Sequence, residues 1–240
     1  MPMADETYGG IENLEALEEA VNYHRFLLEF VCRGIAARQS VVDFGAGTGT
    51  LARALVRRGF SVTCVEPDAV LRARLAALGL RALADAGELP NDSSDVIYAI
   101  NVLEHIRDDW QALRVLRTKL QPTGTLLLYV PAFPLLWSSM DRRVGHVRRY
   151  RRADLAHLLR GCGFAIDAMY YADSLGFFAT LLYKALGKRD GRISKRSVRL
   201  YDRWVFPWSR WSDRAGLRYV FGKNLLAIAR RDESRGGQSD

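Results

Sequence analysis

Apolar positions follow a helical spacing near the start of the chain and a different pattern after it. Between residues 11 and 34 they recur every three or four residues, which predicts a helix. From residue 40 onward, short apolar runs alternate with helical patterns. The predicted strands cover 40–44, 61–65, 80–84, 95–100 and 125–130, and the predicted helices between them cover 48–58, 68–78 and 108–120. Strands that alternate with helices of about ten residues indicate a parallel sheet with helices on both faces.

The pattern changes after residue 130. The sequence Pro-Ala-Phe-Pro at 131–134 is unsuited to a central strand, because proline cannot donate a ladder hydrogen bond. We expect an irregular stretch, a helix, a strand, two aromatic-rich helices and a last strand, over 131–150, 152–160, 164–171, 174–186, 197–215 and 224–229. A polar loop at 187–195 would separate the two aromatic-rich helices, and the polar tail at 232–240 is expected to be disordered.

Composition narrows the class of protein. The chain has 240 residues, of which 49% are hydrophobic and 26% charged, as in ordinary globular proteins of one domain. No apolar run reaches the ~18 residues that a spanning helix needs, and residues 1–12 do not resemble a signal peptide. The three cysteines are scattered, and no group of His, Cys, Asp and Glu has the spacing of metal ligands. We therefore expect a cytoplasmic protein without a metal site.

The net charge of +8 is concentrated in one segment. Residues 142–218 carry 18 Lys and Arg against 6 Asp and Glu, whereas the rest of the chain carries 17 against 21. Within this segment, residues 170–219 interleave aromatic and basic side chains, a pattern similar to interfacial amphipathic regions. Such a stretch would suit an anionic membrane surface or a phosphate-bearing partner. The alternative is a helical lid whose aromatic rings pack on the sheet and whose charges face solvent.

A glycine-rich loop follows the first predicted strand. Residues 45–49 read Gly-Ala-Gly-Thr-Gly and open a helix, so the backbone can turn tightly and approach a ligand. Glu66 ends the next strand, where a carboxylate can reach both hydroxyls of a ribose. The glycine spacing differs from that of dinucleotide folds, and Asp43 would repel a pyrophosphate. Asp43 would instead suit an ammonium group, such as that of S-adenosylmethionine.

Residues 40–130 resemble the class I S-adenosylmethionine-dependent methyltransferases. The motifs that carry the resemblance lie at 43–49, 66–68, 85–86, 89–90, 95–97 and 101–106. The resemblance implies an α/β, Rossmann-like sheet of seven strands that is mostly parallel, with 224–229 as an antiparallel last strand. Motifs at 141–151, 163–164 and 221–226 are similar to those of a bacterial branch without a well-defined substrate, so the acceptor is not implied.

The resemblance also implies a set of residues that bind S-adenosylmethionine. Asp43 and the glycines would line its methionine part, Glu66 the ribose, and Asp85 the adenine, while Asn101 would lie under the cofactor. The N-terminal helix would close over it through Asn22 and Tyr23. The full implied set is Tyr23, Asp43, Gly45, Ala46, Gly47, Thr48, Gly49, Glu66, Pro67, Asp85, Ala86, Asn101, Val102 and Leu103.

A division of the chain within one domain follows from this resemblance. Residues 1–39 would form an N-terminal helical cap and 40–130 the cofactor-binding core. Residues 131–222 would form the acceptor-side loop and the basic, aromatic helical lid. Residues 223–231 would form the last strand, and 232–240 the tail.

Transfer of the methyl group requires alignment and, for a hydroxyl or ammonium acceptor, loss of a proton. Histidine is the usual base, because its unperturbed pKa is ~6.5. His146, in the loop after the fifth strand, is the first candidate and His105 the second, with Asp141 and Tyr150 as potential partners. For each of these four side chains, the alternative to a catalytic role is a purely structural one.

Several acceptors and functions remain in competition. A small or lipid-linked acceptor leads, and the arginines at 142–152 would suit an anionic one. Those arginines could instead pair with Asp141 and Asp154 and hold the loop. An RNA methyltransferase is the second hypothesis, although 101–104 lacks the Asn/Asp-Pro-Pro-aromatic motif of enzymes that methylate base amino groups. A non-catalytic S-adenosylmethionine-binding module is the third, and a nicotinamide oxidoreductase is disfavoured by the glycine spacing.

Overall fold

The computed structural model describes residues 11–35, 39–186, 191 and 194–232. Within them lies one sheet of seven strands, in the order β3-β2-β1-β4-β5-β7-β6. The strands are β1 (Ser40–Phe44), β2 (Ser61–Val65), β3 (Arg81–Leu83), β4 (Ser94–Ile100), β5 (Leu120–Pro131), β6 (Phe164–Ala172) and β7 (Asn224–Arg231). Only β7 runs antiparallel to its neighbours β5 and β6, which confirms the fold class that the sequence predicts.

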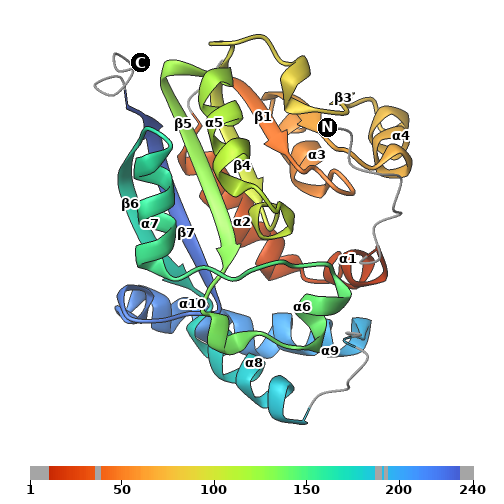
Figure 1. Ribbon diagram of the computed structural model, residues 1–240. Coiled ribbons are helices and arrows are strands. Elements are labelled where there is room, and N and C mark those ends of the chain that lie inside the picture. Colours follow the sequence, from red (N-terminus) through yellow and green to blue (C-terminus); the bar gives the residue numbers. More distant parts are fainter. Residues whose placement is uncertain (1–10, 36–38, 187–190, 192–193, 233–240) are drawn as a thin grey trace.

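Helices cover both faces of this sheet (Figure 1). The helices beside the strands are α2 (Val21–Arg33), α3 (Thr50–Val56), α4 (Ala69–Ala77), α5 (Asp109–Lys119) and α7 (Arg152–Gly161). Neighbouring strand residues point to opposite faces, so Val41 packs in the core with α2 and α3, and Val42 in the core with α5 and α7. Strands buried on both faces must be apolar throughout, which explains the continuous apolar runs.

A second group of helices lies beyond the end of the sheet to which the β4 and β5 arrows point (Figure 1). It consists of α1 (Ile11–Leu17), α6 (Ser139–Arg143), α8 (Ser174–Leu186), α9 (Lys195–Leu200) and α10 (Phe206–Arg214). The described residues also include four short 3-10 turns, at Ala86–Glu88, Leu103–His105, Pro134–Leu136 and Leu217–Tyr219. Among the described residues, none of the helices is both long and apolar enough to span a membrane.

Two predicted helices are divided in the structure. The prediction of one helix over 11–34 is wrong, because the chain turns between α1 and α2 so that α1 can pack beside α9. The prediction over 197–215 misses a π-helical segment, Tyr201–Val205, between α9 and α10. Pro207 explains this segment, since its nitrogen cannot donate to the carbonyl four residues earlier. The predicted disorder of 233–240 and most of the predicted loop at 187–195 lie outside the described residues.

Candidate functional site

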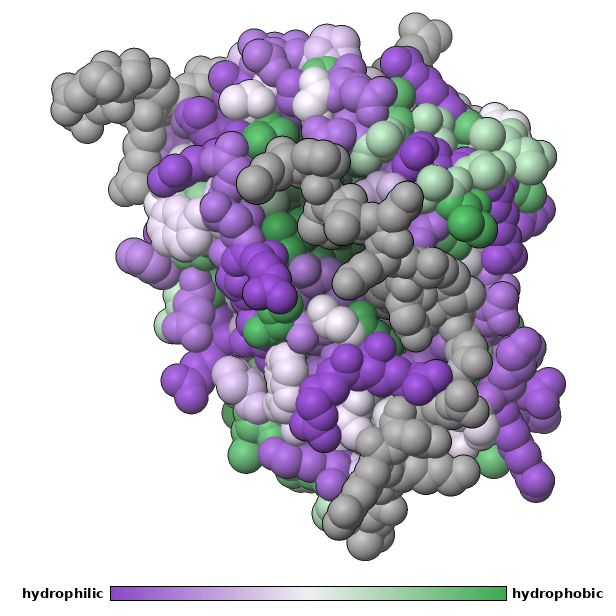
Figure 2. Space-filling model, turned by 45° about the vertical axis from the view of Figure 1, so that its right-hand side comes forward, coloured by the Kyte–Doolittle hydropathy of each residue, from purple (hydrophilic) through white to green (hydrophobic). Residues whose placement is uncertain are grey.

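A cavity of about 770 Å³ opens at the carboxyl ends of β1, β2, β4 and β5. The chain builds β1, β2 and β3 outward and then crosses to β4 on the other side of β1, so the cavity lies where the strand order reverses. Figure 2 shows a hollow with hydrophobic residues inside a mainly hydrophilic face. Of the residues that the sequence nominates, those lining the cavity are Tyr23, Asp43, Gly45, Ala46, Gly47, Thr48, Glu66, Pro67, Asn101, Val102, His105 and His146.

The glycine loop forms the floor of the cavity beside β1. Gly45, Gly47 and Gly49 all have positive φ angles, of 78°, 55° and 76°. A Cβ atom on Gly45 would lie 2.4 Å from a methyl carbon of Val102, whereas one on Gly47 would meet nothing within 4 Å. Gly49 does not line the cavity, because its place is against Leu75 at the packing between α3 and α4. The tight turn and the open space beside Gly47 are what close approach of a ligand requires.

Two buried carboxylates stand on this side of the cavity. Asp43 is 4% exposed, and burial, reinforced by the nearby charge of Glu66, raises its pKa to about 7. The carboxylate of Glu66 accepts hydrogen bonds from the N–H groups of Gly47 (2.8 Å) and Asp68 (3.0 Å), and burial raises its pKa as well. A ligand that carries a cation near Asp43 and hydroxyl donors near Glu66 would compensate this desolvation.

The N-terminal helix reaches the cavity through Tyr23. The side-chain amide of Asn101 donates to the Tyr23 hydroxyl (3.1 Å), and burial raises the pKa of Tyr23 to about 12. Asn101 itself has a φ of 54°, which directs the end of β4 into the cavity. Asn22 lies outside the cavity wall and donates to the carbonyl of Asp202 (3.0 Å).

Asp85 and Ala86, predicted to flank the adenine, and Leu103, predicted to lie beside the cofactor, do not line the cavity. Asp85 accepts a hydrogen bond from the N–H of Gly87 (2.6 Å) and caps a 3-10 turn, while Ala86 and Leu103 are buried in the core. These three assignments are therefore not supported by the geometry. The wall after β2 is formed instead by Pro67, Asp68, Val70 and Leu71.

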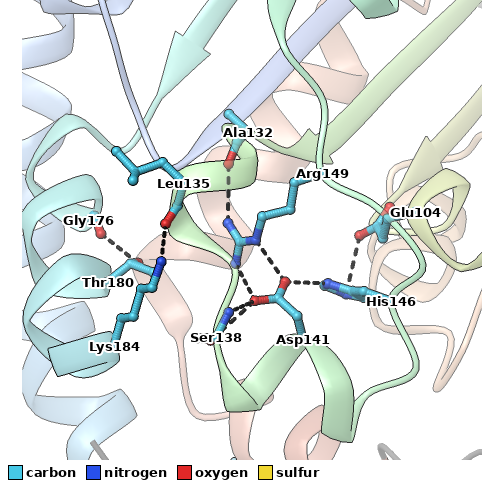
Figure 3. Close-up of polar contacts among 10 residues, drawn as sticks. All are labelled: Glu104, Ala132, Leu135, Ser138, Asp141, His146, Arg149, Gly176, Thr180 and Lys184. Atoms are coloured by element: carbon cyan, nitrogen blue, oxygen red, sulfur yellow. Dashed lines mark hydrogen bonds and ion pairs between the residues drawn. The ribbon is translucent and has the colours of Figure 1, made fainter. Parts of the chain in front are cut away.

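A polar cluster around Asp141 reaches the cavity through Ser138, His146 and Arg149 (Figure 3). The Nδ1 atom of His146 lies 2.7 Å from Oδ1 of Asp141. Asp141 is fully buried and also accepts hydrogen bonds from Nε (2.8 Å) and Nη2 (3.1 Å) of Arg149 and from the N–H of Ser138 (2.8 Å). Burial would raise the pKa of Asp141, but the contacts with His146 and Arg149 hold it well below its usual range. Asp141 therefore stays ionised and orients the ring of His146.

Glu104 and His105 lie against the other edge of the same imidazole. The Oε1 atom of Glu104 is 3.7 Å from Nε2 of His146, and the rings of His105 and His146 are 4.7 Å apart. Glu104 is fully buried, and burial raises its pKa to about 8. Burial and the neighbouring His146 lower the pKa of His105 to about 4, against the contact of His105 with the Gly145 backbone.

Tyr150 does not join this cluster. Its buried hydroxyl donates to Oδ2 of Asp109 (2.9 Å) and lies 3.3 Å from the carbonyl oxygen of Leu103. Tyr150 is also absent from the cavity wall, so the geometry gives it a structural role and does not support the predicted catalytic one. The arginine-rich stretch is partly structural too, since Arg148 pairs with Asp109 and Arg149 with Asp141.

Several cavity residues escaped the sequence analysis because they come from distant elements. They are His24, Leu27, Asp173 and Phe206, and only the packing of distant elements brings them to the cavity. Arg149, Lys223 and Asn224, which belong to the motifs at 141–151 and 221–226, line the cavity as well. Lys223 precedes β7, and burial lowers its pKa, against the nearby charge of Asp173.

Comparisons with known proteins find similarity to methyltransferases. The model of a methyltransferase domain family matches residues 16–168 of this chain. An uncharacterized methyltransferase of Mycobacterium tuberculosis is 37% identical over 119 residues, 47% of this chain and 45% of that protein. A ubiquinone biosynthesis O-methyltransferase of Xanthomonas campestris is 33% identical over 113 residues, 42% of this chain and 47% of that protein. The aligned segments thus span about half the length of these relatives.

Solved structures of low sequence identity share the fold. Phosphoethanolamine N-methyltransferase 2 of Haemonchus contortus, solved with S-adenosylmethionine, superposes with a TM-score of 0.58 at 18% identity. The superposition covers 87% of this chain and 53% of that one. Agreement at this identity concerns the fold alone.

Proposed function

Since this chain belongs to the family of methyltransferase domains, we propose that it transfers the methyl group of S-adenosylmethionine to a hydroxyl-bearing acceptor. The observation that carries the proposal is one cavity with two different walls. Asp43 and Glu66 line one part of the cavity, and His146, which Asp141 holds through Nδ1, lines another. A methyl donor and an acceptor need such an arrangement, because transfer depends on their alignment.

The residues beside β1 and β2 fit S-adenosylmethionine. Asp43 is buried at the cavity wall, where a positively charged ligand would favour its ionised form. Glu66 faces the space beside Gly47 and would accept hydrogen bonds from ribose hydroxyls. When bound, S-adenosylmethionine supplies a methyl group already activated by its attachment to a sulfonium.

His146 would take the proton from the acceptor hydroxyl, whose oxygen then attacks the methyl group. Asp141 holds Nδ1 of its ring, which leaves Nε2 to act on a hydroxyl in the cavity. The ionised Asp141 also stabilises positive charge on the imidazole. Activation of a hydroxyl by a positioned side chain is worth typically ~10²–10⁴-fold in rate.

The acceptor that this cavity suits is hydrophobic with an anionic group. Lys223 lines the wall, which favours a carboxylate or phosphate on the acceptor. A small or lipid-linked molecule fits the enclosed site better than RNA does, because two of the arginines that RNA would need are engaged with Asp109 and Asp141. The sequence similarity to a ubiquinone biosynthesis O-methyltransferase supports a hydroxyl as the accepting group.

A membrane surface is a suitable source of such an acceptor. Trp204, Trp208 and Trp211 recur at four- and three-residue spacing and are 62%, 65% and 64% exposed. Arg203 stacks over Trp204, 5.2 Å from its ring centre. Exposed tryptophans flanked by arginines are typical of helices that bind an anionic lipid surface. Other aromatic residues of 170–219, such as Phe206, are buried in the core, which supports the lid interpretation for them.

Calorimetric titration with S-adenosylmethionine, and separately with NADH, tests the proposal. S-adenosylmethionine should bind and NADH should not. Asp43→Ala and Glu66→Ala should each weaken binding at least tenfold, or ~1.4 kcal/mol. Asp154→Ala, which removes an exposed carboxylate on α7, is the matched control and should bind normally. Normal binding by both cavity variants would contradict the assignment of the cofactor site.

A further inference from the structure

Three side chains with metal-binding atoms meet where His105 and His146 line the cavity. Glu104 and His105 come from the turn after β4, and His146 comes from the loop after α6. One potential ligand atom from each lies within 4.8 Å of the others. Two imidazole nitrogens and one carboxylate oxygen form the donor set of many catalytic sites for divalent transition metals. No sequence spacing predicts this group, because 41 residues separate His146 from His105.

Glu104 lacks the hydrogen bonds that a buried carboxyl group needs, although its Oε1 lies 3.7 Å from Nε2 of His146. It is fully buried, and within the described part of the chain neither of its side-chain oxygens has a hydrogen-bond partner. The guanidinium of Arg149 bonds to Asp141 instead. A buried oxygen without a hydrogen bond lowers the stability of the fold, so the two oxygens of Glu104 need an explanation. A cation between Glu104 and the two histidines would supply the missing partner.

The outer contacts of both histidines suit metal ligation. Asp141 holds Nδ1 of His146 at 2.7 Å, which turns Nε2 toward Glu104. His105 contacts the backbone of Gly145. Metal-binding histidines usually bond through their other nitrogen to a carboxylate or a carbonyl, which fixes the ring. Figure 3 shows that Asp141 is itself fixed by Arg149 and Ser138.

We propose that Glu104, His105 and His146 bind one divalent transition-metal ion, such as Zn²⁺, at the wall of the cavity. The two histidines line the cavity and Glu104 lies behind them, so a coordination position faces the acceptor. Three protein ligands with an open fourth position are the usual arrangement of catalytic zinc. The ion would lower the pKa of a bound acceptor hydroxyl so that its proton leaves to water. In the metal-bound protein, Nε2 of His146 would therefore hold the ion and would not act as the base itself. This role rests on the proposed methyl transfer, whereas binding of the ion does not.

Titration of chelator-treated protein tests the site without any methyl acceptor. Zn²⁺ is followed by calorimetry and Co²⁺ by its visible absorption. We expect one ion per chain, and a loss of at least tenfold in affinity for Glu104→Gln, His105→Ala and His146→Ala. Asp141→Asn should weaken binding by ~10–100-fold, as for other residues that orient a ligand. His157→Gln, which removes an exposed histidine on α7, should bind like the wild type.

The outcomes separate the metal site from the proposed function. Zn²⁺ affinity that is the same for the wild type and Glu104→Gln would overturn the site, and so would the absence of a Co²⁺ spectrum. Glutamine has nearly the same shape as glutamate, so Glu104→Gln should fold normally. A thermal melt checks that it does. S-adenosylmethionine binding is measured on the same metal-free samples. Loss of metal binding in the three variants with intact S-adenosylmethionine binding supports the site, even if no methyl transfer is found.

Discussion

The carboxylate of Asp202, in the π-helical segment, accepts a hydrogen bond from the backbone N–H of Tyr23 at 2.8 Å. The same carboxylate accepts one from Asn22 at 2.9 Å, although 180 residues separate the two. The residue that precedes α2, Ala20, offers no side-chain cap, so Asp202 satisfies the first N–H groups of that helix. This contact ties the second helix group to the helix that carries Tyr23 into the cavity.

Removal of this tie should affect both stability and cofactor binding. Asp202→Ala should lower the free energy of unfolding by about 1–2 kcal/mol, as expected for loss of a helix cap. It should also weaken S-adenosylmethionine binding, because Tyr23 would lose its fixed position. Asp108→Ala, which removes the cap of α5, should cost similar stability but leave binding intact. Urea unfolding and calorimetry distinguish the two effects, and equal binding by both variants would contradict the link.

The raised pKa of Asp43 predicts opposite effects of pH on stability and on binding. Because the folded state holds this proton up to a pH of about 7, the stability contributed by Asp43 falls as pH rises from 4 to 7. Asp43→Asn should therefore be more stable than the wild type at pH 8, by on the order of 4 kcal/mol, and equal at pH 4. Melting curves across this range measure the difference.

Binding should change in the reverse direction with pH. Ionised Asp43 favours a cationic ligand, so the affinity of the wild type for S-adenosylmethionine should rise as pH rises through about 7. Asp43→Asn should bind weakly at every pH. A wild-type affinity that does not vary between pH 6 and pH 8 would argue against ionisation of Asp43 in this range.

Two glycine substitutions distinguish the effect of backbone strain from the effect of a clash at the cofactor site. Gly45→Ala and Gly59→Ala both force alanine into a left-handed backbone, which costs about 1–2 kcal/mol. Only the Cβ of Ala at position 45 would clash, with Val102, whereas nothing lies within 4 Å at position 59. We expect loss of S-adenosylmethionine binding for Gly45→Ala alone. Chemical unfolding gives the cost of each substitution, and normal binding by Gly45→Ala would be the contrary result.

His146 and Tyr150 should respond differently to substitution. His146→Ala should reduce kcat by ~10²–10⁴-fold while S-adenosylmethionine binding is retained. Tyr150→Phe should leave kcat nearly unchanged but cost about 1–3 kcal/mol of stability, because the buried Asp109 carboxylate loses a hydrogen-bond donor. Radiolabelled methyl transfer to an acceptor found by screening, with thermal melts, tests both. A kcat effect as large for Tyr150→Phe would restore its predicted catalytic role.

The exposed tryptophans should direct the protein to anionic lipid. Sedimentation with phosphatidylglycerol vesicles should exceed that with phosphatidylcholine vesicles and should weaken at high salt. Combined substitution of Trp204, Trp208 and Trp211 by serine should abolish it. Substitution of Val56 and Leu78 by serine removes exposed apolar residues elsewhere and should not. Equal sedimentation of both combined variants would oppose a membrane role for the tryptophans.

The sequence by itself determined the sheet and the cofactor side of the cavity. Asp43, the glycine loop and Glu66 lie at consecutive strand ends, so their local order already implies their position at the carboxyl edge of a parallel sheet. The short apolar runs similarly indicated the strands, because a strand buried on both faces must be apolar throughout.

Only the tertiary structure decided the acceptor side. His146 meets Glu104 and His105 through the path of the loop after β5, and Tyr150 turns away from it toward Asp109. Asp202 caps α2 and Lys223 reaches the cavity from elements that no local pattern connects. Contacts between distant segments depend on how helices pack on the sheet, and spacing along the chain carries no record of that packing.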